Sequence, residues 1–101
     1  MEILNKKCVV RCYGAGVFFG TVTKKENTPS GVEVELKDAR RIWYWSGAAS
    51  LSQLATEGVK NPKACKFTVV VPELLVTQCL EIIPATKAAI ANLESVAVWK
   101  M

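Results

Sequence analysis

The chain has 101 residues, of which 50% are hydrophobic and 22% are charged. This length and composition fit a single globular domain spanning residues 1–101 and exclude an intrinsically disordered chain. Thirteen Lys and Arg residues against nine Asp and Glu residues give a formal net charge of +4, which favours an anionic partner but is too small for a histone-like tail.

The N-terminal residues do not form a targeting signal. The sequence MEILNKKCVV contains neither a long apolar stretch nor a small-residue cleavage site, so it does not read as a signal peptide. No apolar run approaches the ~18 residues of a membrane-spanning helix. We therefore expect a soluble, cytoplasmic protein that has no membrane partner.

The first part of the chain is rich in strand-forming residues. Lys7–Tyr13 and Val17–Thr23 are predicted strands, and Gly14-Ala15-Gly16 between them is typical of a three-residue hairpin loop. The polar segment Glu26–Gly31, which contains Pro and Gly, predicts a turn after the second strand.

Two further strands follow this turn. Val32–Lys37 alternates between apolar and charged residues, which indicates an antiparallel strand with one face in water. A tight turn at Asp38-Ala39 is then expected to lead into the strand RRIWYW, at Arg40–Trp45.

A short helix is predicted after the aromatic strand. Ser50 is a suitable N-cap, Gln53 three residues later completes a capping box, and Gly58 ends the helix. The polar segment Lys60–Lys63 connects this helix to the rest of the chain.

The C-terminal part is expected to contain two strands and a second helix. The strands are Cys65–Val71 and Leu75–Ile83, on either side of Pro72-Glu73, and the helix runs from Pro84 to about Leu93. The tail after this helix carries Trp99 and should dock back onto the domain. Together these elements predict an α+β fold: a curved antiparallel sheet or partial β-barrel of about six strands, with two short helices.

The four cysteines do not indicate a metal site. Cys8 and Cys12 are four residues apart, Cys65 and Cys79 are isolated, and the chain has no histidine. This spacing fits no zinc knuckle. We expect all four to be reduced, small hydrophobic side chains, and we predict no cofactor.

Catalysis is not expected. The commonest general base is missing because the chain has no histidine, and neither a phosphate-binding loop nor a nucleophile motif is present. Asp38 is the acidic residue beside the aromatic strand, but Asp is also a common turn residue. The sequence predicts a protein that is not an enzyme.

The aromatic strand is the main candidate for a binding site. Alternate side chains of a strand share a face, so Arg41, Trp43 and Trp45 should lie on one face, and Arg40, Ile42 and Tyr44 on the other. In one interpretation the tryptophans pack under the C-terminal helix and the arginines pair with Glu33 or Glu35. In the other, one face is open, its rings stack on a flat base, and its arginine binds phosphate.

The segment after the aromatic strand could add backbone donors to such a site. The N-terminus of a helix carries a partial positive charge and free N–H groups, and Gly47–Ser50 leads into the predicted helix; a simple helix entry built from small residues explains the same pattern. The candidate ligand-binding residues are therefore Arg40, Arg41, Trp43, Tyr44, Trp45, Gly47 and Ser50.

The run DARRIWYWSGAASLSQLA at Asp38–Ala55, with NPxxCKF and EIIPATxxA further on, resembles a family of short uncharacterised phage proteins. The resemblance covers roughly the last two thirds of the chain, and its core is RRIWYWSGAASL. By analogy of class, it implies an immune-evasion protein that sequesters a signalling molecule without catalysis, often as an oligomer.

The sequence and this resemblance lead to one main hypothesis and two alternatives. The main hypothesis is a phage-encoded, homo-oligomeric anti-defence protein that sequesters a nucleotide-type signal, either a cyclic oligonucleotide or a cyclic ADP-ribose-like molecule, in the host cytoplasm. The first alternative is a single-stranded nucleic-acid-binding module. The second is a protein-binding inhibitor of a host factor or a structural homo-oligomer, with Trp43, Trp45 and Trp99 as interface anchors.

Overall fold

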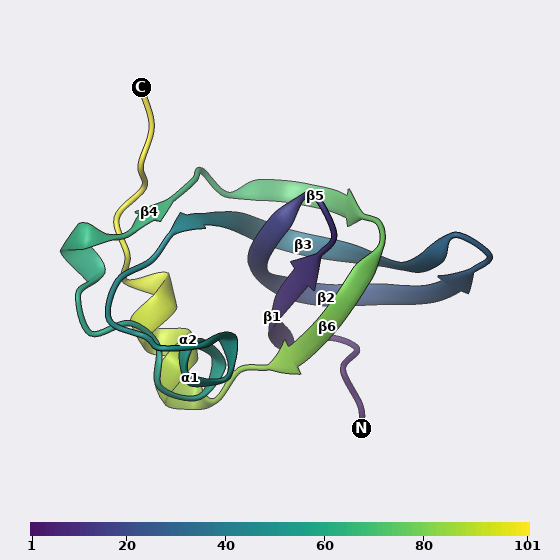
Figure 1. Cartoon of the computed structure of the whole chain (residues 1–101), viewed down its shortest axis with the longest axis horizontal. Helices are drawn as coiled ribbons and strands as arrows, with labels where there is room; N and C mark the ends of the chain where they lie inside the picture. Colours follow the sequence, from purple (N-terminus) through teal and green to yellow (C-terminus); the bar gives the residue numbers. More distant parts are fainter.

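The computed structural model describes residues 1–101 and contains one sheet and two short α-helices (Figure 1). In chain order the elements are β1 (Lys7–Cys12), β2 (Gly16–Thr28), β3 (Gly31–Tyr44), α1 (Leu51–Glu57), the 3₁₀ helix η1 (Pro62–Ala64), β4 (Lys66–Phe67), β5 (Val71–Val76), β6 (Cys79–Pro84) and α2 (Lys87–Glu94). The six strands pair antiparallel in the order β4-β3-β2-β1-β6, and β5 pairs with β3. The predicted α+β class with a partial barrel is confirmed.

The predicted turn at Asp38-Ala39 is wrong, because β3 runs through it as one continuous strand. The pairing of β2 with β3 shifts here, so that Gly20 faces two residues of β3. Asp38 adopts a left-handed backbone with φ of 51°, and a Cβ on Gly20 would lie 3.0 Å from the Cα of Ala39. Asp and Gly therefore form a β-bulge, which bends the strand without ending it.

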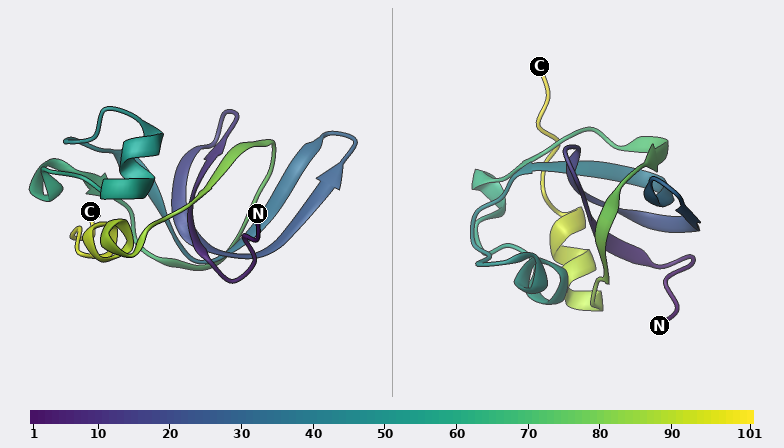
Figure 2. Two further views of the ribbon diagram at one scale, coloured as in Figure 1. Left: turned by 90° about the horizontal axis from the view of Figure 1, so that it is seen from below. Right: turned by 45° about the vertical axis from the view of Figure 1, so that its right-hand side comes forward.

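The bend lets β3 pair with two strands along the same edge. Val34–Ala39 pairs with β5, and Ile42–Tyr44 pairs with β4. The sheet consequently curls into an open barrel, from which the β2–β3 hairpin projects at one end (Figures 1 and 2). The helices and the C-terminal segment lie at the other end (Figure 2).

The sheet carries a hydrophobic core on each face. The core inside the barrel contains Phe18 and the two cysteines Cys12 and Cys79. The core on the outer face contains Phe19 and Phe67, with Leu54 from α1 and Leu93 from α2. The adjacent phenylalanines of β2 thus point into different cores, as alternation along a strand requires.

The predicted strand boundaries in the C-terminal half are also wrong. Of the expected strand Cys65–Val71, Lys66–Phe67 forms β4 and Val71 already begins β5, and Pro72-Glu73 lies inside β5. Pro72 is tolerated there because β5 is an edge strand, pairing only with β3. The turn between β5 and β6 is at Thr77-Gln78, where Gln78 has φ of 54°.

The predicted N-cap and end of α1 are confirmed, but the capping box is not, because Gln53 Oε1 accepts from the N–H of Ala49 and not from that of Ser50. The backbone N–H of Gln53 donates to Ser50 Oγ, and Gly58 ends the helix with φ of 81°. Helix α2 begins later than predicted, with Thr86 as its N-cap, because Pro84 still belongs to β6. Neither helix has the length and apolar character needed to cross a membrane.

Candidate ligand-binding site

The aromatic strand does not alternate along its whole length. Arg40 and Ile42 are buried, whereas Arg41 and Trp43 are exposed, as alternation predicts. The register against β4 then shifts between Ile42 and Tyr44, so that Tyr44 is half exposed and Trp45 packs against the outer core. The predicted face that groups Arg41, Trp43 and Trp45 is therefore formed only by its first two members.

Trp43 finds an aromatic partner at the other end of the chain. Its ring stacks on Trp99 with centroids 5.0 Å apart and 29° between the planes. The Nζ of Lys66 lies 5.2 Å from the Trp43 centroid and 5.3 Å from that of Trp99. The three groups thus form a nearly equilateral cluster, and each ring has the cation within range of a cation–π contact.

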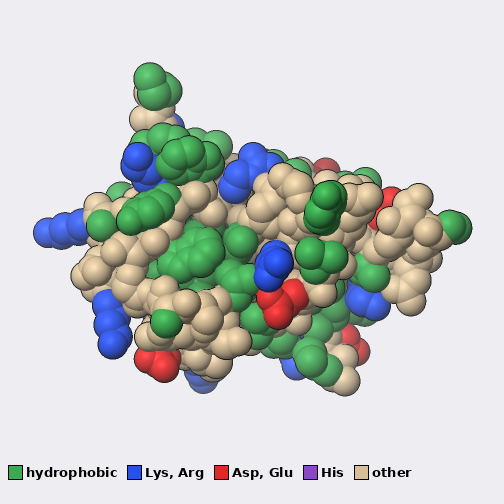
Figure 3. Space-filling view, viewed as in Figure 1, with side chains coloured by type: hydrophobic (Ala, Val, Ile, Leu, Met, Phe, Trp, Pro, Cys, Tyr) green, Lys and Arg blue, Asp and Glu red, His purple; other side chains and the backbone are tan.

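This cluster lies at the surface. Trp43 is 58% exposed and Trp99 is 41% exposed. In the space-filling view, hydrophobic and basic side chains lie side by side where the C-terminal segment leaves the domain, and no acidic side chain shows at that corner (Figure 3). We call Arg41, Trp43, Lys66 and Trp99 the tryptophan patch.

The C-terminal segment is fixed to β4 by its backbone. Val98 forms a parallel bridge with Phe67, and the N–H of Trp99 donates to the carbonyl of Phe67 at 2.8 Å. The expected docking of the tail is confirmed. No local sequence signal identifies Trp99 as the partner of Trp43, because the contact depends on this long-range pairing.

The buried side chain of Arg40 also binds the C-terminal segment. Its guanidinium donates to four backbone carbonyls: Val96 at 2.8 Å, Thr68 at 3.0 Å, Ala97 at 3.2 Å and Phe67 at 3.3 Å. Burial lowers the pKa of Arg40, but arginine stays protonated in proteins. The structure therefore places Arg40 outside the tryptophan patch, as the residue that ties β3 to the C-terminal segment.

Arg41 is the arginine that faces solvent. Its Cζ lies 4.8 Å from the centroid of the Phe18 ring, and its backbone N–H donates to Thr68 Oγ1. The two ion pairs of the chain are Lys7–Glu94 and Lys24–Glu35, so neither predicted partner, Glu33 or Glu35, pairs with Arg41. Its guanidinium is therefore available to an external anion.

Gly47 and Ser50 have structural roles in the loop before α1. A Cβ on Gly47 would lie 2.5 Å from the backbone N of Lys60, and the φ of Gly47 is 94°. Glycine is required here because the backbone of Lys60 lies too close for a side chain and because the backbone is left-handed. Ser50 caps the helix, and the N–H of Ala49 donates to Gln53 Oε1. α1 has only seven residues, and its entry amides are partly occupied.

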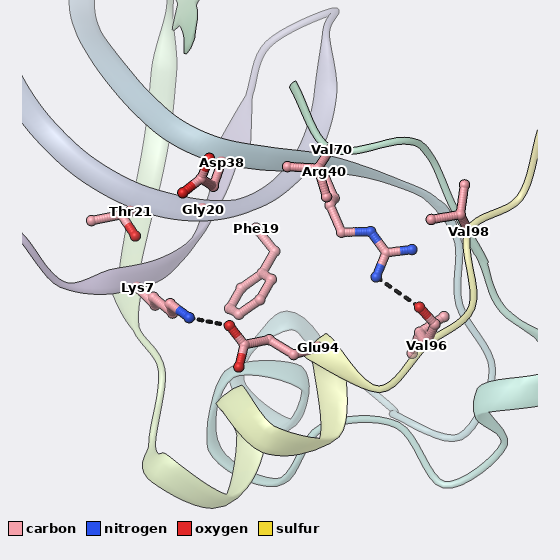
Figure 4. Close-up of a pocket in the computed structure, with 10 residues that line it drawn as sticks. All are labelled: Lys7, Phe19, Gly20, Thr21, Asp38, Arg40, Val70, Glu94, Val96 and Val98. Atoms are coloured by element: carbon pink, nitrogen blue, oxygen red, sulfur yellow. Dashed lines mark hydrogen bonds and ion pairs between the residues drawn. The ribbon is translucent and has the colours of Figure 1, made fainter. Parts of the chain in front are cut away.

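Two hollows border the C-terminal segment. The first, of about 360 Å³, lies between the bend of β3 and α2, and is lined by Phe19, Asp38, Arg40 and the Lys7–Glu94 pair (Figure 4). Its charges are mixed, and Arg40 points its N–H groups toward the chain's own carbonyls. This hollow offers no net positive site for an anion.

The second hollow, of about 480 Å³, has Trp99 as one wall. Lys63, Ser95 and Val98 are among its other lining residues. Its volume falls in the range of small-molecule pockets, and a ligand seated there would contact Trp99 beside a lysine. The tryptophan patch and this hollow together form the candidate site.

All four cysteines are buried and none forms a disulfide. No group of three or more His, Cys, Asp or Glu side chains is placed to hold a metal ion.

A family model described as "Domain of unknown function (DUF6948)" matches residues 5–93. No curated protein and no solved structure gives a significant match. The family match spans most of the motif region that suggested a phage origin, but its description names neither a phage protein nor an activity. The phage resemblance therefore stays a prediction, and the functional argument depends on the site.

Proposed function

We propose a function for this chain, which belongs to the DUF6948 family: it binds a nucleotide-type ligand at the tryptophan patch and does not turn it over. The observation that carries the proposal is the exposed Trp43–Trp99 pair with the Lys66 ammonium beside both rings. The proposed ligand is a cyclic oligonucleotide or a cyclic ADP-ribose-like signal. The analogy to phage proteins implies that the chain sequesters this signal.

Aromatic exposure supports a recognition role. Large indole rings that are 58% and 41% exposed leave apolar surface in water, and such patches beside polar groups often mark binding sites. A nucleobase has a flat face of similar size. Stacking on an aromatic side chain contributes about 1–3 kcal/mol per base.

Cations beside the rings support a phosphate-bearing ligand. Arg41 lies two residues before Trp43 on the same face of β3, and no carboxylate pairs with it. Lys66 is within 5.3 Å of both ring centroids, and Lys63 lines the hollow that Trp99 borders. Arginine binds phosphate with two parallel hydrogen bonds, and lysine adds a point charge.

Calorimetry tests the proposal. The unsubstituted protein is titrated with cyclic dinucleotides, cyclic trinucleotides and cyclic ADP-ribose isomers, and with adenosine as an uncharged reference. We expect binding of at least one phosphate-bearing ligand. Trp43→Ala should weaken this binding by roughly 5- to 150-fold, the equivalent of one stacked base. Arg41→Ala, as a separate variant, should also weaken binding, and its effect should decrease as the salt concentration rises.

Tyr13→Ala is the matched control. Tyr13 is an aromatic residue that is 71% exposed and lies in the turn between β1 and β2, so its removal should leave binding unchanged. Failure of every ligand to bind, or equal losses in Trp43→Ala and Tyr13→Ala, would refute the proposal.

A second candidate is binding of single-stranded nucleic acid, and the openness of the patch favours it. The rings are stacked on each other at the surface, where a strand could pass over them. Lys63 lines the hollow that Trp99 borders, and Lys100 follows Trp99 in the chain. This function predicts affinity for oligonucleotides that falls steeply as salt concentration rises. A cyclic ligand with few phosphates would show a much shallower dependence.

A further inference from the structure

Cys12 and Cys79 form a thiol pair outside the candidate site. Their Sγ atoms lie 3.2 Å apart, and the two residues are direct register partners across β1 and β6. Partners across antiparallel strands have Cα atoms about 4.5–5.5 Å apart, which falls within the range of disulfides. The pairing and the facing Sγ atoms therefore bring the two cysteines close to the geometry of a disulfide, beside a register shift between Arg11 and Cys12.

The other two cysteines have no sulfur partner. Cys8 lies four residues before Cys12 on the same strand, which corresponds to about 13 Å at the rise of a β-strand, and its thiol contacts the carbonyl of Lys6. Cys65 belongs to the core on the opposite face of the sheet, and its thiol contacts the carbonyls of Ser46 and Asn61. Any intramolecular disulfide of the folded chain is thus restricted to one pair.

The position of the pair makes it reachable by local opening. Cys12 is 4% exposed and Cys79 is 8% exposed, so the closed state shields both. However, Cys12 ends β1, and Cys79 begins β6, an edge strand that pairs only with β1, directly after the turn at Thr77-Gln78. Strand ends beside a turn open more easily than a sheet centre.

We propose that Cys12 and Cys79 are a redox-active pair that a peroxide oxidises to a disulfide joining β1 to β6. The thiolate of one cysteine attacks a peroxide oxygen, which gives a sulfenic acid and releases water or an alcohol. The thiol of the second cysteine then attacks the sulfenic sulfur, forms the S–S bond and releases water. Two thiols are oxidised by two electrons, and the peroxide O–O bond is reduced.

Both thiols are protonated in the closed state. Burial raises the pKa of Cys79 to about 12, and it raises that of Cys12 as well. Because both thiols hold their protons at neutral pH, oxidation of the closed state is slow. The rate should therefore follow the opening of the β1–β6 edge.

Peptide mapping tests the proposal on the folded, unsubstituted protein. After hydrogen peroxide treatment, free thiols are blocked with iodoacetamide in denaturant, and the protein is cleaved with trypsin. Cleavage after Arg11 separates Cys8 from Cys12, so the four cysteines fall in four different peptides. We expect one linked species, which joins the peptide that begins at Cys12 to the one that contains Cys79, and which disappears on reduction.

A double variant, Cys8→Ala with Cys65→Ala, provides the matched control and should form the same link. The oxidised protein should also unfold at a higher urea concentration than the reduced protein, because the bond closes a long loop in the unfolded chain. Linkage through Cys8 or Cys65, or peroxide modification without any linked peptide, would overturn the proposal. So would an oxidised protein that unfolds at the same or a lower urea concentration.

Discussion

Replacing Arg40 with Met tests whether Arg40 stabilises the fold while the adjacent Arg41 remains free to bind a ligand. The substitution keeps an unbranched side chain over the Phe67 ring, where the guanidinium now lies at 5.1 Å, but it removes every donor. Arg40 is 6% exposed, so water cannot easily replace the lost contacts. We therefore expect a large loss of stability from a change that conserves length and apolar character.

The magnitude follows from the hydrogen bonds. The bonds to Val96 and Phe67 are buried, and those to Thr68 and Ala97 are partly accessible to water. A hydrogen bond to a charged group contributes about 1.5–3 kcal/mol, so the two buried bonds alone predict a decrease of about 3–6 kcal/mol in the free energy of unfolding. That is a large share of the stability of a typical small domain.

Urea unfolding followed by far-ultraviolet circular dichroism measures this decrease. Arg41→Met is the control, because Arg41 is exposed and donates no side-chain hydrogen bond to the chain. Its free energy of unfolding should change by less than about 1 kcal/mol. If Arg40→Met were as stable as Arg41→Met, the four carbonyls would not depend on the guanidinium, and our account of the C-terminal segment would be wrong.

Three further predictions concern other parts of the chain. Gly58→Ala should lower the free energy of unfolding by about 2–3 kcal/mol, because a Cβ at this φ of 81° would lie 2.2 Å from Asn92 Oδ1. Gly14 has a similar φ but nothing near its missing Cβ, so Gly14→Ala should lower the free energy of unfolding by only about 1 kcal/mol. Equal urea midpoints for the two variants would contradict this prediction. Ser50→Ala should lower the helix stability by about 1 kcal/mol without changing nucleotide affinity measured by calorimetry, and a large loss of affinity would instead assign Ser50 to the site. Burial raises the pKa of Cys8 to about 11 and that of Cys79 to about 12, from 9.0. As the pH rises, the unfolded chain therefore loses these thiol protons before the folded chain does, and the urea midpoint should fall between about pH 9 and about pH 12. Cys8→Ala should make this fall smaller.

The sequence predicted those features that depend on neighbouring residues. Ser50, Gln53 and Gly58 mark the limits of α1 because caps act within one turn of a helix. Alternation predicted that one arginine would be buried and the other exposed, but it did not say which. That depends on the helices covering the outer face of the sheet, where Arg40 lies.

Features that depend on distant residues could not be predicted. Asp38 is compatible with both a turn and a β-bulge. It lies in a bulge because β2 pairs with β3 both before and after Asp38. In the same way, the position of Trp99 follows from the bridge between Val98 and Phe67. The open aromatic face that was expected on the strand is completed by Trp99 of the C-terminal segment, which also borders the adjacent hollow.

The indole N–H signals of Trp43, Trp45 and Trp99 in a nitrogen–proton correlation spectrum test the central proposal most directly. The three signals are assigned from single Trp→Phe variants, and the spectrum is followed during titration with a cyclic dinucleotide or cyclic ADP-ribose that binds in calorimetry. We predict that the signals of Trp43 and Trp99 shift together in proportion to the bound fraction, while that of Trp45, which packs against the outer core, stays in place. A bound ligand that leaves Trp43 and Trp99 unshifted would contradict the proposal that the tryptophan patch is the binding site.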